Sequence, residues 1–177
     1  IYGRHGEAPL VVLAPKSPSH CFEIGQQAVR IAIKYMTPVM ILSDAYLTNA
    51  SEPWLIPDTS KIKESPVSFG KTQENYMPFE RDPKTLARKW VKPGTEGMEH
   101  RIGGLEKDSL TGNISYDPDN HASMTDLRKQ KVQRVHGRSD DGEKEKVGWI
   151  RRVLQGWKVF RDDLEFYQGC WRKWSIE

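Results

Sequence analysis

Cysteine is scarce in this sequence, and its scarcity excludes two classes of protein. Only Cys21 and Cys170 occur among the 177 residues. Two thiols cannot build a disulfide-rich scaffold, and they cannot supply the four thiolates of a metal cluster. The other ligand-bearing side chains show neither the spacing of a zinc site nor that of a calcium loop. We therefore expect no metal site in this chain.

Long apolar runs and a strong charge of one sign are also missing. No stretch approaches the roughly 20 apolar residues that a membrane span needs. The 27 Lys and Arg nearly balance the 24 Asp and Glu, which leaves a net charge of +3. A nucleic-acid binder normally concentrates its cations on one face. We therefore expect a cytoplasmic protein with no membrane and no nucleic acid among its partners.

The chain has no initiator Met and no basic or apolar leader at its start, which is Ile1. We therefore expect a fragment or a processed chain. Aromatic residues, in contrast, are plentiful, with six Trp, six Tyr and five Phe. This content argues against wholesale disorder.

The beginning of the sequence has the pattern of an α/β fold. Residues 10–13 are a short apolar run of the kind found in buried parallel strands. Apolar positions over residues 21–35 recur at helical spacing, and Ser17 is the expected N-cap with Pro18 at the first helical position. Residues 39–42 form a second apolar run, which we expect to be a second buried strand. Strand, helix and strand in this order predict a βαβ unit.

Residues 48–97 break this periodicity, because six prolines interrupt them. We interpret them as an extended connector that lies on another surface. Its anchors are expected to be its aromatic residues, Trp54, Phe69, Tyr76, Phe79 and Trp90.

Regular structure is expected to return after the connector. A short hairpin is indicated around residues 114–116, and residues 117–120 are expected to cap a helix over residues 121–135. In the tail, residues 136–177, apolar side chains recur at three- and four-residue steps and predict an amphipathic helix.

Two segments are candidates for functional residues. Arg4, His5 and Glu7 lie in a glycine-rich turn before the first strand, where they could place a titratable imidazole and a cation beside an anionic substrate. Alternatively, these charges pair with one another or with a partner subunit. Asp44 follows the second strand, at the edge where open α/β sheets bind ligands. Its alternative role is to cap the following turn.

Several segments together resemble one family. They are residues 2–9, 10–18, 35–44, 51–54 and 99–118, the last beginning Glu99-His100-Arg101-Ile102-Gly103-Gly104-Leu105-Glu106-Lys107. The sequence looks like the alpha subunits of 2-oxoglutarate:ferredoxin oxidoreductases, over roughly residues 1–135. The long run from residue 99 to residue 118 makes this resemblance specific for the two-subunit branch of the 2-oxoacid:ferredoxin oxidoreductases.

The resemblance implies a domain plan. Residues 1–47 would end a thiamine-pyrimidine-type α/β domain, 48–97 would be the connector, and 98–135 would enter a transketolase-C-terminal-like domain. The tail, residues 136–177, departs from the family, either by divergence or through a shifted reading frame. Ala45 also departs, because the family usually has Gly there, where positive φ is more comfortable.

The resemblance also implies a reaction and its partners. The complex converts 2-oxoglutarate and coenzyme A to succinyl-CoA and CO₂, and passes electrons to ferredoxin. A beta subunit would hold most of the thiamine diphosphate, with Mg²⁺ and an iron–sulfur cluster. Two upstream family signatures are absent here, so the chain is expected to be inactive alone. Two alternatives stay open: a pyruvate or branched-chain 2-oxoacid as substrate, and a non-catalytic paralogue that acts as an interaction module.

Overall fold

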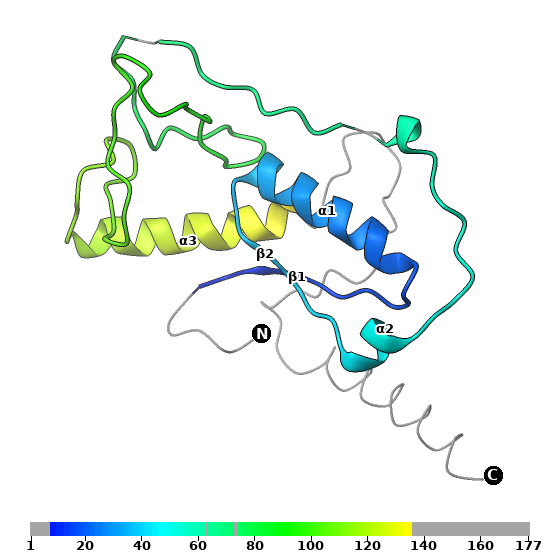
Figure 1. The fold of residues 1–177 in the computed structure, drawn as a ribbon. Helices are drawn as coiled ribbons and strands as arrows, with labels where there is room; N and C mark the ends of the chain where they lie inside the picture. The colour runs from blue at the N-terminus through cyan, green and yellow to red at the C-terminus, as the bar shows by residue number, and fades with distance from the viewer. Residues whose placement is uncertain (1–7, 63, 73, 136–177) are drawn as a thin grey trace.

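The computed structural model describes residues 8–62, 64–72 and 74–135 (Figure 1). Its elements follow the order β1, α1, β2, α2, a 3-10 turn η1, and α3. The expected turn at residues 3–7 and the expected tail helix lie outside the described residues. None of the helices in the described part of the chain is long and apolar enough to cross a membrane.

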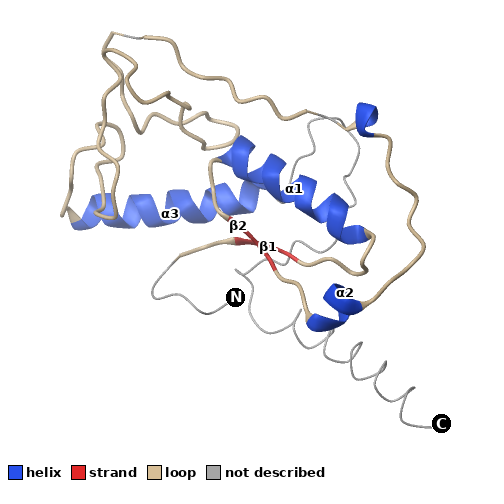
Figure 2. Ribbon diagram, in the orientation of Figure 1, coloured by secondary structure: helices blue, strands red, loops and turns tan. Residues whose placement is uncertain are grey.

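The predicted βαβ unit is confirmed, and the fold is mixed α/β. Strand β1 (Val11–Leu13) pairs in parallel with β2 (Val39–Ile41), so that Val12 lies opposite Met40. Helix α1 (His20–Tyr35) connects the two strands (Figure 2). The helix begins two residues after the expected start. Its N-cap is Ser19, while the Ser17 hydroxyl accepts a hydrogen bond from the His20 N–H at 3.4 Å.

Helix α1 ends because the chain turns sharply before Pro38. Met36 takes a left-handed conformation, with φ of 45°, and its N–H donates to the Ala32 carbonyl. The residue before a proline avoids the helical region, so Thr37 cannot extend α1. The sequence predicted this end correctly.

The core lies where three elements meet. Helix α3 (Pro118–Val135) brings its last turn against α1, as Figure 1 shows. The Tyr35 hydroxyl donates to the Arg134 carbonyl at 3.4 Å across this contact. The buried cluster draws residues from β1, α1 and the end of α3: Val11, Leu13, Ile24, Ala28, Ile31, Tyr35 and Val135. Burial of these apolar side chains drives the packing of α3 onto the βαβ unit.

The expectation that both strands are buried is wrong for β2. Val11, Val12 and Leu13 of β1 are all buried, but Met40 and Ile41 of β2 keep 46% and 43% of their surface exposed. An apolar run predicts burial on both faces only when other elements cover both faces of the sheet. The described residues form a two-stranded sheet, so β2 presents apolar side chains that they leave uncovered.

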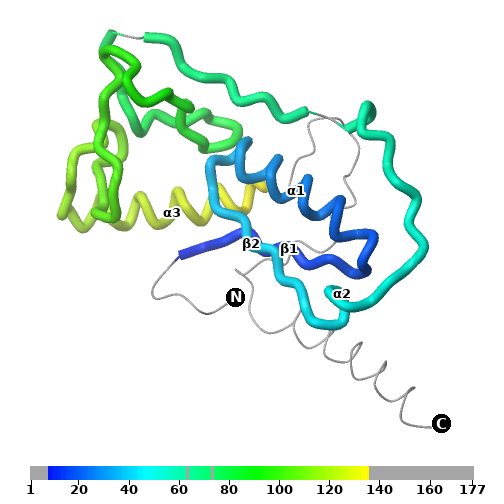
Figure 3. Tube along the Cα trace, viewed as in Figure 1, coloured from blue at the N-terminus to red at the C-terminus, as the bar shows by residue number. Residues whose placement is uncertain are grey.

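The connector is irregular, and two of its tryptophans anchor it to α1. The Trp54 ring packs on Phe22, with 5.6 Å between ring centroids. The Trp90 indole Nε1 donates to the Ile33 carbonyl at 3.1 Å. The chain between them follows a long path around the unit, which Figure 3 traces. It contains η1 (Thr59–Lys61), and a short helix, α2 (Ala45–Asn49), precedes it. Neither was expected from the sequence.

Candidate functional site

The sequence-predicted site residues fall into two groups. Arg4, His5 and Glu7 lie outside the described residues. Asp44 is described, and it caps α2: its Oδ1 accepts a hydrogen bond from the Leu47 N–H at 2.8 Å, and its carbonyl accepts from the Thr48 hydroxyl. The capping role considered for Asp44 is therefore confirmed. Its role toward a ligand stays a prediction.

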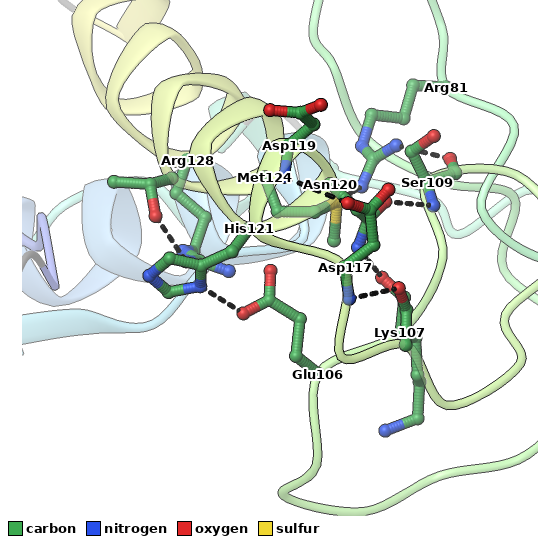
Figure 4. Close-up of polar contacts among 12 residues, drawn as sticks. Arg81, Glu106, Lys107, Ser109, Asp117, Asp119, Asn120, His121, Met124 and Arg128 are labelled. Carbon is green, nitrogen blue, oxygen red and sulfur yellow. Dashed lines mark hydrogen bonds and ion pairs between the residues drawn. The ribbon is translucent and has the colours of Figure 1, made fainter.

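A polar cluster that the sequence did not predict forms where the run of residues 99–118 meets the start of α3 (Figure 4). Asn120, in the first turn of α3, joins the two segments. Its Oδ1 accepts from the Ser109 N–H at 3.0 Å, and its Nδ2 donates to the Lys107 carbonyl at 3.0 Å. One side chain thereby satisfies two backbone groups of the incoming segment.

Residues 106–115 fold back on themselves as a short hairpin. Lys107 and Ile114 form an isolated antiparallel bridge, and the Asp108 N–H donates to the Asn113 carbonyl at 2.7 Å. Asp108 Oδ1 accepts from the N–H groups of Leu110 and Thr111. These bonds lower the pKa of the Asp108 carboxyl, with the Thr111 N–H as the largest cause. The predicted hairpin is thus present, although it contains a single bridge rather than two strands.

Lys107 is a buried cation that no carboxylate neutralises within the described chain. Its side chain folds back, and its Nζ donates to the carbonyls of Gly103 and Leu105 at 2.9 and 2.5 Å. Hydrogen bonds that involve a charged donor are stronger than neutral ones. The ammonium therefore closes the loop of residues 103–107 and gives that loop a fixed shape.

A histidine and a glutamate form the titratable pair of the cluster. His121 Nδ1 lies 2.5 Å from Glu106 Oε2, and the imidazole faces solvent while the carboxylate is mostly covered. Glu106 Oε1 is buried without a hydrogen-bond partner among the described residues. This contact joins the hairpin to the helix, and Figure 4 shows the Glu106 side chain reaching from its loop toward His121 in the first turns of α3.

Arg81 attaches a third segment to the cluster. Its Nη1 donates to the carbonyls of Phe79 and Ser109 at 3.0 and 2.9 Å, and its Nη2 lies 3.2 Å from the Met124 sulfur. Burial is the largest cause that lowers the pKa of Arg81, and the positive charges of Arg88 and Arg128 add to it. The guanidinium of Arg81 therefore links three segments: its own loop at Phe79, the hairpin at Ser109, and α3 at Met124.

The described residues do not gather the carboxylates that would hold the Mg²⁺ of a bound thiamine diphosphate. A diphosphate is commonly bound with Mg²⁺ and carboxylates, yet no group of three His, Cys, Asp or Glu side chains gathers within the described part of the chain. Asp44, the sequence-predicted candidate, uses its carboxylate to cap α2. We therefore derive no chemical step through that cofactor from these residues.

Fold and sequence together define the class of the protein. Residues 2–115 match the family described as pyruvate flavodoxin/ferredoxin oxidoreductase, thiamine diphosphate-binding, and the chain belongs to that family. This agrees with the resemblance carried by residues 2–18, 35–44 and 99–118.

Two individual members of related enzymes show which subunits the chain is similar to. The chain is 51% identical over 136 residues to the 2-oxoglutarate oxidoreductase subunit KorA of Mycobacterium tuberculosis, covering 77% of this chain and 21% of that protein. It is 39% identical over 56 residues to the ketoisovalerate oxidoreductase subunit VorB of Methanothermobacter marburgensis, covering 32% of this chain and 16% of that subunit.

A solved structure has a similar fold. It is the 2-oxoglutarate:ferredoxin oxidoreductase from Magnetococcus marinus with 2-oxoglutarate, coenzyme A and succinyl-CoA bound. The TM-score is 0.66 at 28% identity, over 76% of this chain and 23% of that one. The chain thus spans about a fifth of the length of each of these two 2-oxoglutarate oxidoreductase chains.

Proposed function

We propose that this chain is part of the alpha subunit of a 2-oxoglutarate:ferredoxin oxidoreductase. The observation that carries the proposal is the 51% identity over 136 residues to a 2-oxoglutarate oxidoreductase subunit. The reaction would convert 2-oxoglutarate and coenzyme A to succinyl-CoA and CO₂. The two electrons released would pass to ferredoxin in the same cytoplasmic complex.

The catalytic cofactors would belong mainly to a beta subunit. Thiamine diphosphate with Mg²⁺ would supply the electron sink for decarboxylation, and an iron–sulfur cluster would carry the electrons. Arg4, His5 and Glu7 are the residues of this chain that we place nearest the substrate, and Asp44 is a weaker candidate for the cofactor.

The open face of β2 supports a role as one part of a larger subunit. Met40, Ile41 and Leu42 are all substantially exposed although they are apolar. A two-stranded sheet is marginal by itself, and α/β sheets are covered on both faces. We propose that β2 continues into the sheet of a thiamine-pyrimidine-type domain, and that residues 98–135 lead into a transketolase-C-terminal-like domain.

A second substrate class has a specific observation in its favour. The 39% identity to a ketoisovalerate oxidoreductase subunit extends over 56 residues. A branched-chain 2-oxoacid would place an apolar group where 2-oxoglutarate places its distal carboxylate. The longer match to the 2-oxoglutarate subunit favours 2-oxoglutarate. A non-catalytic interaction module, the third possibility, predicts binding to partners without turnover.

Reduction of a viologen dye by the assembled complex tests these alternatives. The chain would be produced as part of the full alpha subunit of its source genome together with the beta subunit, and by itself as the control. We expect reduction that depends on coenzyme A and is at least tenfold faster with 2-oxoglutarate than with pyruvate or 2-oxoisovalerate. The control should show no turnover. Faster reduction with 2-oxoisovalerate would contradict the substrate, and full turnover by the 177-residue chain alone would contradict its role as a part.

A further inference from the structure

Arg81 and Arg88 both lie beside the Phe79 ring, and Lys131 is close enough for their positive charges to act on it. We define the basic cluster as Arg81, Arg88 and Lys131. Arg81 and Arg88 face each other across an isolated antiparallel bridge, and Lys131 comes from α3. All three are half-buried. Like charges directly opposite each other in a β-bridge are destabilising, so this arrangement needs a physical reason.

The loop that pairs the two arginines is well fixed. Asp82 Oδ1 accepts from the N–H groups of Lys84 and Thr85 at 2.9 and 2.7 Å. The Asp82 N–H also donates to the Ala87 carbonyl at 2.9 Å, and both Leu86 and Ala87 are buried. Side-chain bonds of this kind define a tight turn. The loop therefore holds Arg81 and Arg88 in place against their mutual repulsion.

Phe79 provides a platform for the arginine side chains. The guanidinium carbon of Arg88 lies 4.5 Å from the ring centroid and that of Arg81 lies 5.7 Å from it. On the ring's edge, a Cβ added at Gly112 would come within 3.1 Å of Phe79 Cδ2. The ring is thus fixed by close backbone contact. An arginine stacked on an aromatic ring is oriented while the N–H donors at its edge stay available.

The cluster lacks a counter-charge in the described chain. The Arg81 guanidinium donates to two backbone carbonyls and contacts the Met124 sulfur. Within residues 8–62, 64–72 and 74–135, Arg88 and Lys131 donate no hydrogen bond, and no carboxylate lies within ion-pair distance of any of the three. Burial, then the charges of Arg81 and Arg88, lower the pKa of Lys131 to about 8. A half-buried cation without an anion is costly.

We propose that the basic cluster binds the phosphate group of a small phosphomonoester or free phosphate. The fork of Arg88 can donate two bonds to neighbouring phosphate oxygens, and the ammonium of Lys131 can act as a point charge on a third. A phosphate dianion would compensate both free cations, whereas one carboxylate would compensate only one. The site is independent of the reaction proposed above and stands whether or not that reaction is correct.

Titration of the full 177-residue chain with inorganic phosphate, glycerol 3-phosphate, acetate and citrate tests the site. The readouts are calorimetric affinity and the pKa of Lys131, followed by NMR at its Cε. We expect both phosphate compounds to bind and to raise the pKa of Lys131 by about one unit, equivalent to a tenfold coupling. Tighter binding of glycerol 3-phosphate would identify a phosphomonoester as the source, and equal binding would identify free phosphate.

Variants separate binding from folding. Lys131→Met and Arg88→Gln should each weaken phosphate binding about tenfold, while Lys129→Met, an exposed lysine on the same helix, should leave it within twofold. If Arg88→Gln does not fold, Arg88→Lys replaces it in the test, because it keeps the positive charge and removes the forked guanidinium. Three results would overturn the site: no change in the Lys131 pKa at saturating phosphate, equal loss with Lys129→Met, or citrate and acetate binding as tightly as phosphate. The last would point to a carboxylate-bearing protein partner.

Discussion

The βαβ unit and the loop-rich segment before α3 are ordered by different forces. In the unit, β1 and one face of α1 bury apolar side chains such as Leu13 and Ile24. In the segment of residues 79–117, the side chains of Asp82 and Asp108 bond instead to backbone N–H groups, and Asn120 in the first turn of α3 bonds to the backbone of Lys107 and Ser109. The first kind of order tolerates exchange among apolar residues of similar size. The second depends on individual polar atoms, so single substitutions should have narrow and specific effects.

Removal of a core side chain from the unit should have the largest effect. Leu13 is fully buried, and Leu13→Ala should lower the free energy of unfolding in urea by about 3 kcal/mol, because it leaves a cavity. Leu42→Ala, at an exposed apolar position next to β2, is the matched control and should cost less than about 1 kcal/mol. Equal losses would show that burial does not distinguish Leu13 from Leu42.

Removal of the Asn120 side chain, which joins the loop-rich segment to α3, should have the next largest effect. Asn120→Ala leaves the Ser109 N–H and the Lys107 carbonyl without their partner, which should cost about 2 kcal/mol. Amide exchange at Ser109 should accelerate, while exchange within α1 stays unchanged. Asn113→Ala is the control, because Asn113 contributes its backbone to the hairpin. If Asn113→Ala accelerated amide exchange at Ser109 as much as Asn120→Ala does, the Asn120 side chain would not be what holds the hairpin to α3.

Alanine at two glycines should have opposite effects in the two regions. Gly112 has φ of +73° and its added Cβ would meet the Phe79 ring, so Gly112→Ala should destabilise the fold by about 1–2 kcal/mol. Gly25 lies inside α1 with open space at its Cβ position, so Gly25→Ala should stabilise it by about 0.5–1 kcal/mol. Thermal unfolding of both variants measures the contrast. Changes of the same sign would refute it.

The smallest effect concerns pH and the hairpin. The Thr111 and Leu110 N–H groups hold the pKa of Asp108 below its ordinary value. Because the folded-state pKa is lowered, the stabilisation is complete above about pH 4. It is lost as the pH falls through the folded-state value. The NMR shift of the Thr111 amide should follow this titration in the wild-type chain and not in Asp108→Asn. A pKa of Asp108 at or above its ordinary value would contradict this.

The sequence predicted the elements that local patterns encode. The apolar runs predicted both strands, and helical spacing over residues 21–35 predicted α1 and its end. The helix over residues 121–135 was also predicted, although α3 begins at Pro118, where Asp117 accepts from the Asp119 N–H. The signals for these elements lie within a few residues of one another, and no distant contact is needed to interpret them.

Features that depend on distant contacts were not predictable. The exposure of β2 depends on whether another element covers it, which an apolar run does not encode. From the sequence, Asn120 is interpreted as part of a helix cap. Its bonds to Lys107 and Ser109 form only when the hairpin folds back onto α3. Likewise, Arg81 and Lys131 are fifty residues apart, and only the tertiary fold brings their charges together.

Oxidation of Met40 by hydrogen peroxide tests most directly whether this chain is one part of a larger alpha subunit. Met40 of β2 is 46% exposed, while Met98 is 1% exposed and serves as the internal reference. We expect Met40 to be oxidised much faster than Met98 in the chain alone. Within the full alpha subunit bound to its beta subunit, we expect Met40 to be protected at least tenfold. An unchanged oxidation rate of Met40 in that complex would contradict the proposal that other parts of a larger subunit cover β2.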